Sequence, residues 1–324
     1  MPSRTYELLA NLFREAREAQ LTAGRAELTE ERNQHEALGD GYQPRAGVSD
    51  ELIEGTVPGT RLMTPAGARD DLVIVFVHGG GFRTGSPRTI RQLGSQLALN
   101  ARARVLLPKY RLAPEHPYPA ALDDCESVYT HALSLVPGAK VVIGGESAGA
   151  NLAAALLLRR RDAGDERVLA GFLYGGVFDL SLENYTAGSW VGNAGTDLAL
   201  HPALGPIMTC DYLAGQRASD GYASPALCDL TGLPPLFLQV SSAECLLDDT
   251  LALTTAAARA GVHVELEVWP RMLHSWQAAA GFLPEATEAV ERTAAFIQRV
   301  ADGRIVDGAE LSGGPASLDD IQQS

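Results

Sequence analysis

The first candidate for chemistry is Ser147, the central residue of the pattern Gly145-Glu-Ser-Ala-Gly149. An apolar β-branched run at 141–143 precedes the pattern, and an Ala- and Leu-rich tract that reaches Leu158 follows it. This order predicts a strand, a tight turn and a helix. A serine on such a turn, with small residues two positions away on either side, exposes its hydroxyl at the top of a sheet as a nucleophile. The pattern also occurs by chance in many chains, but its flanking strand and helix favour the functional interpretation.

A second candidate is the glycine-rich segment His78-Gly-Gly-Gly-Phe82, which directly follows the apolar run Leu72 to Val77. Three successive glycines leave backbone N–H groups unshielded by any Cβ and able to point into a cavity. Such donors stabilise the oxyanion of a tetrahedral intermediate, an effect of about 3 to 4 kcal/mol per donor. A flexible turn or a phosphate-binding loop is the alternative. The sequence has neither G-x-G-x-x-G nor a P-loop lysine here, which disfavours phosphate.

The elements that must hold these loops alternate along the chain from residue 60 onward. Strand-like runs lie at 61–63, 72–77, 105–107, 140–143, 168–174, 235–240 and 262–269, and helical tracts at 88–100, 148–161, 249–260 and 284–301. Such alternation predicts an α/β fold with a mostly parallel sheet, covered by helices on both faces. Reactive residues then lie at the carboxyl ends of the strands.

Two segments fall outside this alternation. Residues 4–37 carry apolar positions at helical spacing, and residues 179–222 contain a helix-like stretch from Leu198 to Leu213 but no good strand. We expect N-terminal cap helices in 1–50, a catalytic domain in 51–301 with a cap insertion at about 179–222, and a disordered tail in 302–324. The two helical segments would form a cap over the sheet, although plain packing helices are an equal alternative for the first.

Composition restricts the class of partner. The formal net charge of −14 disfavours nucleic acid and anionic membranes, which would repel the surface. No apolar run is long enough to span a membrane, and the first residues lead into charged helical sequence, so we expect a cytoplasmic protein. The four cysteines are scattered without metal-ligand spacing, which predicts buried free thiols, no metal and no disulfide. Those residues are Cys125, Cys210, Cys228 and Cys245.

Taken together, the motifs resemble those of the hormone-sensitive-lipase-like family of α/β-hydrolases, the bacterial family IV carboxylesterases. The resemblance rests on His78 to Phe82, Tyr110-Arg-Leu-Ala-Pro-Glu115, Tyr118-Pro-Ala-Ala-Leu-Asp-Asp124, Gly145 to Asn151, Ala223-Ser-Pro225, Gly232-Leu-Pro-Pro235 and His274. It covers residues 60 to 301 and implies a carboxylesterase with a triad of Ser, acid and His, an oxyanion hole and a helical cap. The expected oxyanion donors are the N–H groups of Gly80, Gly81 and Ala148, and no cofactor is implied.

The resemblance implies that the acid lies in the loop after the strand at 235–240. The family usually has Asp-Pro-Leu-x-Asp-Asp there, whereas this chain has Glu244-Cys-Leu-Leu-Asp-Asp249. Aligning the leucine and the two aspartates puts Glu244 at the position of the acid. Glutamate is adequate because the acid only orients the imidazole and stabilises its cation. Asp248 and Asp249 are rivals, which also fit the first turn of the following helix.

The base is expected to be His274, which lies after the last strand and follows Ser147 and Glu244 in the order of this fold. The other histidines are expected to be surface or structural residues, with His78 and His116 bracing loops through hydrogen bonds. Arg111, Glu115 and Asp124 are expected to form an ion-paired scaffold beneath the oxyanion loop. Asn151, on the helix behind the nucleophile, is expected to fix backbone.

These observations predict a serine hydrolase that cleaves carboxylic esters of short to medium acyl chains, or lactones, through an acyl-enzyme. The partner is a small-molecule ester. A non-hydrolytic dehydratase or cyclase on the same scaffold is the alternative, and a ligand-binding receptor is disfavoured because every triad position is filled. Neither the natural substrate nor the choice between monomer and homodimer follows from the sequence.

Overall fold

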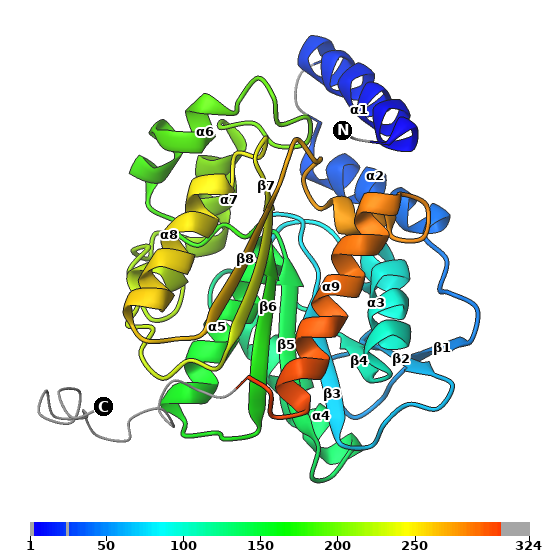
Figure 1. Ribbon diagram of the computed structural model, residues 1–324. Coiled ribbons are helices and arrows are strands. Elements are labelled where there is room, and N and C mark those ends of the chain that lie inside the picture. Colours follow the sequence, from blue (N-terminus) through cyan, green and yellow to red (C-terminus); the bar gives the residue numbers. More distant parts are fainter. Residues whose placement is uncertain (1–2, 24–25, 306–324) are drawn as a thin grey trace, which may run out of the picture.

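The computed structural model describes residues 3–23 and 26–305, and these residues are organised around a twisted sheet (Figure 1). Within this part of the chain the sheet has eight strands in the order β1-β2-β4-β3-β5-β6-β7-β8. The strands are β1 (Val48–Leu52), β2 (Arg61–Pro65), β3 (Leu72–Val77), β4 (Arg104–Leu107), β5 (Lys140–Glu146), β6 (Val168–Tyr174), β7 (Leu236–Ser241) and β8 (Val264–Trp269). The β1–β2 and β2–β4 pairs are antiparallel, and all the others are parallel. The predicted α/β-hydrolase architecture is therefore confirmed.

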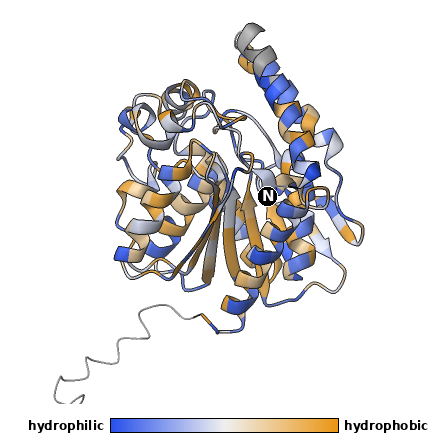
Figure 2. Ribbon diagram, turned by 45° about the horizontal axis from the view of Figure 1, so that its top comes forward, coloured by the Kyte–Doolittle hydropathy of each residue, from blue (hydrophilic) through white to orange (hydrophobic). Residues whose placement is uncertain are grey.

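The central strands are apolar because both of their faces are covered. Every residue of β3 and β7 is buried, as are all residues of β5 after Lys140. Strands covered on both faces need continuous apolar runs, which is the pattern that made them recognisable in the sequence. In Figure 2 the hydrophobic colour follows these strands, whereas the helices carry both colours.

Helices cover the sheet on both faces. The core on one side includes residues of α3 (Pro87–Ala101) and α9 (Pro284–Ala301). The core on the other includes residues of α4 (Ala120–Leu135), α5 (Ala148–Asp162) and α8 (Leu247–Arg259). Local sequence sets the start of α3, where Ser86 and Thr89 form a capping box and Pro87 occupies the first turn.

The remaining helices gather at one end of the sheet (Figure 1). They are α1 (Arg4–Ala23), α2 (Leu28–Gly41), η1 (Leu182–Thr186), α6 (Gly188–Gly192) and α7 (Leu204–Leu213). Two short turns, η2 (Pro225–Leu227) and η3 (Trp276–Ala279), complete the list of helical elements in the described part of the chain. The hydroxyl of Tyr6 in α1 donates a hydrogen bond to the carbonyl of Arg271, in the loop after β8. This end is therefore the one at which the parallel strands finish.

Three expectations need correction or fall outside the described residues. β1 begins at Val48, so the segment 1–50 is not helical throughout; the strand escaped notice because it is a half-exposed edge strand with two acidic residues. The helix expected from Leu198 begins only at Leu204, because Pro202 disfavours a helical conformation before it. Residues 306–324, most of the expected tail, lie outside the described part of the chain.

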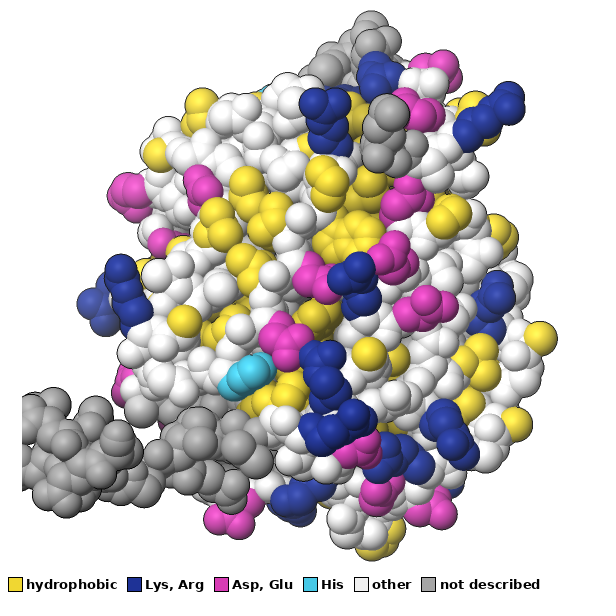
Figure 3. Space-filling view, viewed as in Figure 1, with side chains coloured by type: hydrophobic (Ala, Val, Ile, Leu, Met, Phe, Trp, Pro, Cys, Tyr) yellow, Lys and Arg dark blue, Asp and Glu magenta, His cyan; other side chains and the backbone are white. Residues whose placement is uncertain are grey.

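The surface carries both signs of charge. Figure 3 views the face formed by β8 and α9, where basic and acidic side chains are interspersed around small apolar patches. Ion pairs such as Arg292–Glu267 and Arg299–Glu265 join α9 to β8 on this face. No helix in the described ranges is long and apolar enough to cross a bilayer.

The four cysteines are free thiols, but they are not all buried. Cys125 and Cys245 lie in the core, Cys228 is half-buried and Cys210 is exposed on α7. The expectation of four buried thiols is therefore wrong for two of them. Cys210 is exposed because α7 belongs to the helical segment that covers the sheet from outside.

Candidate active site

Ser147 lies on a sharp turn between β5 and α5, with φ = 55° and ψ = −126°. A positive φ is strained for a residue with a side chain, so the surroundings must impose it. The turn is tight because the chain passes close to itself on both sides: a Cβ on Gly145 would lie 2.1 Å from the carbonyl oxygen of Gly149, and one on Gly149 would lie 2.2 Å from that of Val77. Glycine is therefore required at both ends of the motif, and the serine hydroxyl is held away from the sheet.

Three side chains from separate loops meet at this turn. The Nε2 atom of His274 lies 2.9 Å from Ser147 Oγ, and its Nδ1 atom lies 2.6 Å from Glu244 Oε2. The other carboxylate oxygen of Glu244 accepts a hydrogen bond of 2.8 Å from the N–H of Ser241. The loops follow β5, β7 and β8, whose carboxyl ends share one edge of the sheet. The structure thus brings together the three residues that the sequence singled out.

The electrostatics of the pair suit a base that must gain a proton. Glu244 is 1% exposed, and burial raises the pKa of its carboxyl, while hydrogen bonds and the charge of His274 act in the opposite direction. Burial by itself would lower the pKa of His274, but the adjacent Glu244 carboxylate outweighs it and raises that pKa to about 9. The imidazolium form, which a general base adopts during the reaction, is therefore stabilised.

The glycine-rich loop after β3 offers unused donors beside the serine. Gly80 and Gly81 have φ values of 102° and 60°, and no described residue accepts a hydrogen bond from their N–H groups or from that of Ala148, the first residue of α5. A Cβ on Gly80 would lie 2.3 Å from the carbonyl oxygen of Thr84, so the loop requires glycine there. These N–H groups are available to a ligand.

Glu146, which the sequence analysis left without a role, joins the two halves of the site. Its Oε1 atom accepts a hydrogen bond of 2.6 Å from the N–H of Gly79, and its Oε2 atom accepts one from the hydroxyl of Ser275, the residue after His274. One side chain thus connects the glycine-rich loop to the histidine loop. Glu146 occupies the first x of G-x-S-x-G, a position at which the motif allows any residue. Its acidic character is the one signal in the sequence that could have indicated a role.

The rival acids hold the insertion in place. Asp248 Oδ2 accepts a hydrogen bond of 2.7 Å from the N–H of Ser189. Asp249 accepts hydrogen bonds of 2.9 Å from both the N–H of Phe178 and the indole of Trp190. Burial raises the pKa of Asp249 to about 6. Both carboxylates bind groups outside the Ser147 and His274 pair.

The loop His78 to Phe82 is braced from behind. His78 is fully buried, stacks on Tyr110 with ring centroids 4.1 Å apart, and its Nδ1 atom lies 2.8 Å from the carbonyl of Gly79. Burial lowers its pKa to about 3, so the ring is neutral and donates from Nδ1. The expected bracing role holds for His78. It is wrong for His116, which is exposed and bonds no described residue through its side chain.

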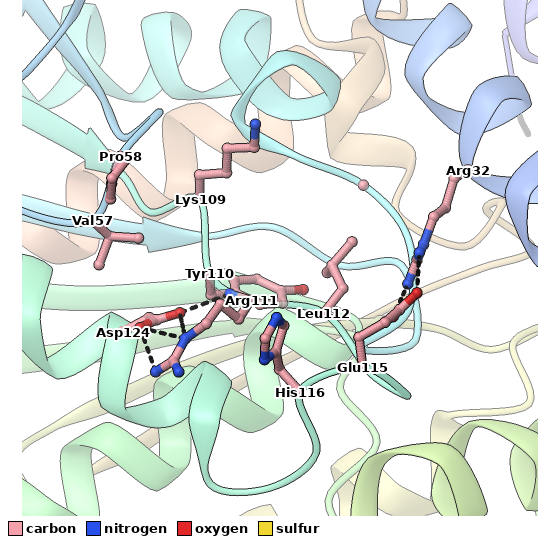
Figure 4. A pocket seen from close by; sticks show the side chains of 11 residues that line it. Arg32, Val57, Pro58, Lys109, Tyr110, Arg111, Leu112, Glu115, His116 and Asp124 are labelled. Atoms are coloured by element: carbon pink, nitrogen blue, oxygen red, sulfur yellow. Dashed lines mark hydrogen bonds and ion pairs between the residues drawn. The ribbon is translucent and has the colours of Figure 1, made fainter.

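The predicted ion-paired scaffold divides into two pairs, drawn in Figure 4. The guanidinium of Arg111 donates hydrogen bonds to both carboxylate oxygens of Asp124, whereas Glu115 pairs with Arg32 of α2. Arg32 escaped the sequence analysis because nothing local marks it as a partner. These residues line a cavity of about 540 Å³ that has no triad member in its wall.

Two further expectations concern structural side chains and metals. Asn151 fixes backbone as expected, since its amide donates to the carbonyls of Val177 and Ala223 at 2.8 and 3.0 Å. His35 of α2 is structural as well, with Nδ1 2.8 Å from the hydroxyl of Thr84 in the glycine-rich loop. Among the described residues, no group of three or more His, Cys, Asp or Glu side chains is arranged to hold a metal ion.

Comparison with known proteins gives the class to which this geometry belongs. A family model described as the alpha/beta hydrolase fold matches residues 74–278. An acetyl-hydrolase of Streptomyces hygroscopicus is 40% identical over 236 residues, which cover 72% of this chain and 78% of that protein. Carboxylesterase NlhH of Mycobacterium tuberculosis is 32% identical over 252 residues, which cover 74% of this chain and 77% of that protein.

Solved structures agree with the sequence relatives. An esterase from the bacterial hormone-sensitive lipase family has a TM-score of 0.84 at 35% identity, covering 92% of this chain and 99% of its own. EstE5, whose crystal was soaked with p-nitrophenyl butyrate, has a TM-score of 0.84 at 31% identity with the same coverage. The chain therefore belongs to the α/β-hydrolase fold family. Within that family it is one of the bacterial hormone-sensitive-lipase-like carboxylesterases, as its motifs predicted.

Proposed function

We propose that this protein is a serine carboxylesterase in which Ser147 is the nucleophile, His274 the general base and Glu244 the acid that orients it. The observation that carries the proposal is the continuous hydrogen-bonded chain from Ser147 Oγ through both ring nitrogens of His274 to Glu244. A serine becomes nucleophilic when an adjacent base, itself oriented by a third group, accepts its proton.

The reaction proceeds in two steps, acylation of Ser147 and hydrolysis of the acyl-enzyme. His274 accepts the proton of Ser147 Oγ as that oxygen attacks the ester carbonyl, and the resulting oxyanion accepts hydrogen bonds from the N–H groups of Gly80, Gly81 and Ala148. The intermediate collapses, the C–O bond to the alcohol breaks, and His274 protonates the departing alcohol. Water, deprotonated by the same imidazole, then attacks the acyl-enzyme; the C–O bond to Ser147 breaks, His274 returns the proton to Oγ, and the acid is released. These steps use no cofactor.

We further propose esters of short acyl chains, or lactones of similar size, as substrates. Met208 of α7 supports this limit, because its Sδ atom would lie 3.5 Å from a Cβ on Gly81. A methionine so close to the oxyanion loop restricts the space beside the carbonyl of a bound ester. The named relatives are consistent with small acyl groups, since one is an acetyl-hydrolase and the crystal of another was soaked with a butyrate ester.

We assign the covering role to two helical segments, the N-terminal helices α1 and α2 and the insertion at about 179–222, with the catalytic domain beginning at β1 and reaching residue 301. Two contacts support a joint cap: Tyr6 bonds the loop that carries His274, and Arg17 donates to the carbonyl of Ala194 in the insertion. A cytoplasmic location completes the proposal, and fractionation of cells tests it. Size-exclusion chromatography with light scattering decides between monomer and homodimer.

The alternative of a dehydratase or cyclase has no feature of this chain in its favour. A complete Ser, His and acid triad next to N–H donors without a partner is the arrangement needed for acyl transfer. A reaction that only transfers protons would not need the serine. Labelling with a fluorophosphonate separates the classes, because it requires an activated Ser147. If the proposal is right, enzyme that reacts with the fluorophosphonate should convert an ester into its acid and alcohol, which product analysis identifies.

The decisive experiment replaces the nucleophile. Ser147→Ala should lower kcat for p-nitrophenyl acetate and butyrate by about 10⁶-fold, because the attacking oxygen is lost while the rest of the site stays in place. Circular dichroism and thermal unfolding verify that the variant is folded. Substantial turnover by folded Ser147→Ala would refute the assignment.

A further inference from the structure

The loop between β7 and α8, which carries Glu244, has only long hydrogen bonds between its own backbone groups. The N–H of Glu244 lies 3.3 Å from the carbonyl oxygen of Ser241, and the N–H of Leu247 lies 3.3 Å from that of Glu244. Both distances are at the long end of the range for hydrogen bonds between amides. The triad nevertheless needs this loop to be positioned to within a fraction of an ångström. Other parts of the chain must therefore hold it.

Side chains of the insertion bond the carbonyl groups of this loop. The amide of Asn193 donates to the carbonyl of Glu244 at 2.8 Å and to that of Ser242 at 3.2 Å. The hydroxyl of Thr196 lies 3.2 Å from the carbonyl of Ala243, as well as from a carbonyl within its own turn. Three consecutive carbonyls, from 242 to 244, thus face donors that come from outside the sheet domain.

Asp197 completes this contact by binding the next N–H group. Its Oδ2 atom accepts a hydrogen bond of 2.8 Å from the N–H of Cys245, directly after the triad acid. Its Oδ1 atom accepts from Ala199 and Leu200 at 3.0 and 2.9 Å, which fixes the turn of the insertion itself. Asp197 is 2% exposed. One buried carboxylate therefore joins the insertion to the acid loop.

We propose that Asp197 is a positioning residue for the triad: from the insertion it holds the backbone beside Glu244, so that the acid meets His274, and it supplies a further negative charge behind the imidazole. The inference rests on the role proposed above for Glu244. Asp197 acts through that loop and not on the substrate, because both of its oxygens are occupied by backbone N–H groups and its side chain is buried.

The charge of Asp197 has its own consequence for His274. The carboxylates that raise the pKa of this histidine are Glu244, Asp197 and Glu146, in that order, against the lowering effect of burial. Arg17 supplies a positive charge on the same side, which partly offsets the rise that burial and Asp197 cause in the pKa of Cys245. Only neutral His274 can accept a proton, so loss of the charge at Asp197 should extend activity to lower pH.

The test compares Asp197→Asn with Thr196→Val, using p-nitrophenyl acetate over the pH range in which each variant stays folded. Asp197→Asn should lower kcat roughly 10- to 100-fold with KM nearly unchanged, because a misplaced acid affects the transition state and not the binding of substrate. It should also move the acid limb of kcat/KM down by about half to one pH unit. Thr196→Val removes a neutral contact to the same loop. It should cause a smaller loss of kcat and leave the acid limb of the kcat/KM profile at the pH of the wild type.

The outcomes that overturn the proposal are distinct. An Asp197→Asn variant with the kcat and acid limb of the wild type would show that the carboxylate does not position the triad, and a raised KM at constant kcat would make it a substrate contact. If Asp197→Asn does not fold, Asp197→Glu replaces it: this variant keeps the charge but displaces the carboxylate, should lower kcat without moving the acid limb, and contradicts the proposal if kcat is unchanged. Activity in Ser147→Ala would instead refute the proposed function itself.

Discussion

The nucleophile side and the acid side of the site are built in different ways. Ser147 and the glycine-rich loop are fixed by backbone packing, with Gly145, Gly149 and Gly80 each closer to another carbonyl oxygen than a Cβ would allow. The backbone around Glu244 is held by side chains of a distant segment, chiefly Asn193 and Asp197. Local sequence therefore specifies one half of the site, whereas tertiary contacts specify the other.

Replacing the acid of the triad should have the largest effect on activity. Glu244→Gln should lower kcat by about 10³- to 10⁴-fold, because the amide no longer stabilises the imidazolium or selects its competent tautomer. Asp248→Asn is the matched control, since that carboxylate binds the N–H of Ser189 on the insertion. Steady-state kinetics with p-nitrophenyl butyrate measure both. A large loss in the Asp248 variant alone would mean that the wrong carboxylate is assigned.

Replacing Glu146, which connects the glycine-rich loop to the histidine loop, should have a smaller effect on kcat. Glu146→Gln keeps the size of the side chain but can accept from only one of its two partners, Gly79 and Ser275, so kcat should fall roughly tenfold. Ser275→Ala removes one partner alone. If the bridge is real, the double variant should lose less than the product of the single losses. Multiplicative losses in kcat would show that the two loops are held independently.

The smallest expected effect concerns substrate size. Met208→Ala opens space beside Gly81, so kcat/KM for a longer acyl chain should rise roughly five- to tenfold relative to that for acetate. Met208→Leu conserves volume and is the control, with the acyl-chain profile of the wild type. The measurement is a series of p-nitrophenyl esters of increasing length. An unchanged profile in Met208→Ala would remove Met208 from the wall of the acyl site.

The central strands and the Ser147 turn could be predicted because their signals are local. A strand buried on both faces, such as β3, is a continuous apolar run, and a turn that admits only glycine at two positions leaves a readable pattern. β1 was missed because an edge strand has no such run. The position of Glu244 needed comparison with a family, since its loop has no pattern of its own.

The contacts that hold the acid loop could not be predicted, for a physical reason. Asn193 and Asp197 lie about fifty residues before Glu244, in a segment without regular periodicity, and they bind backbone atoms, which every residue has. No partner type in the sequence marks such a contact. The pairing of Glu115 with Arg32 was missed for the same reason, because Arg111 was the nearer cation along the chain.

The structure of the insertion limits how the substrate range of this protein can be changed by engineering. Met208 and Asp197 belong to the same helical segment, one beside the glycine-rich loop and the other behind the triad acid. Exchanging the whole segment for that of another hydrolase would therefore alter both the fit of the substrate and the rate of turnover. Changes of substrate range are best confined to α7, with the stretch from Asn193 to Asp197 left intact.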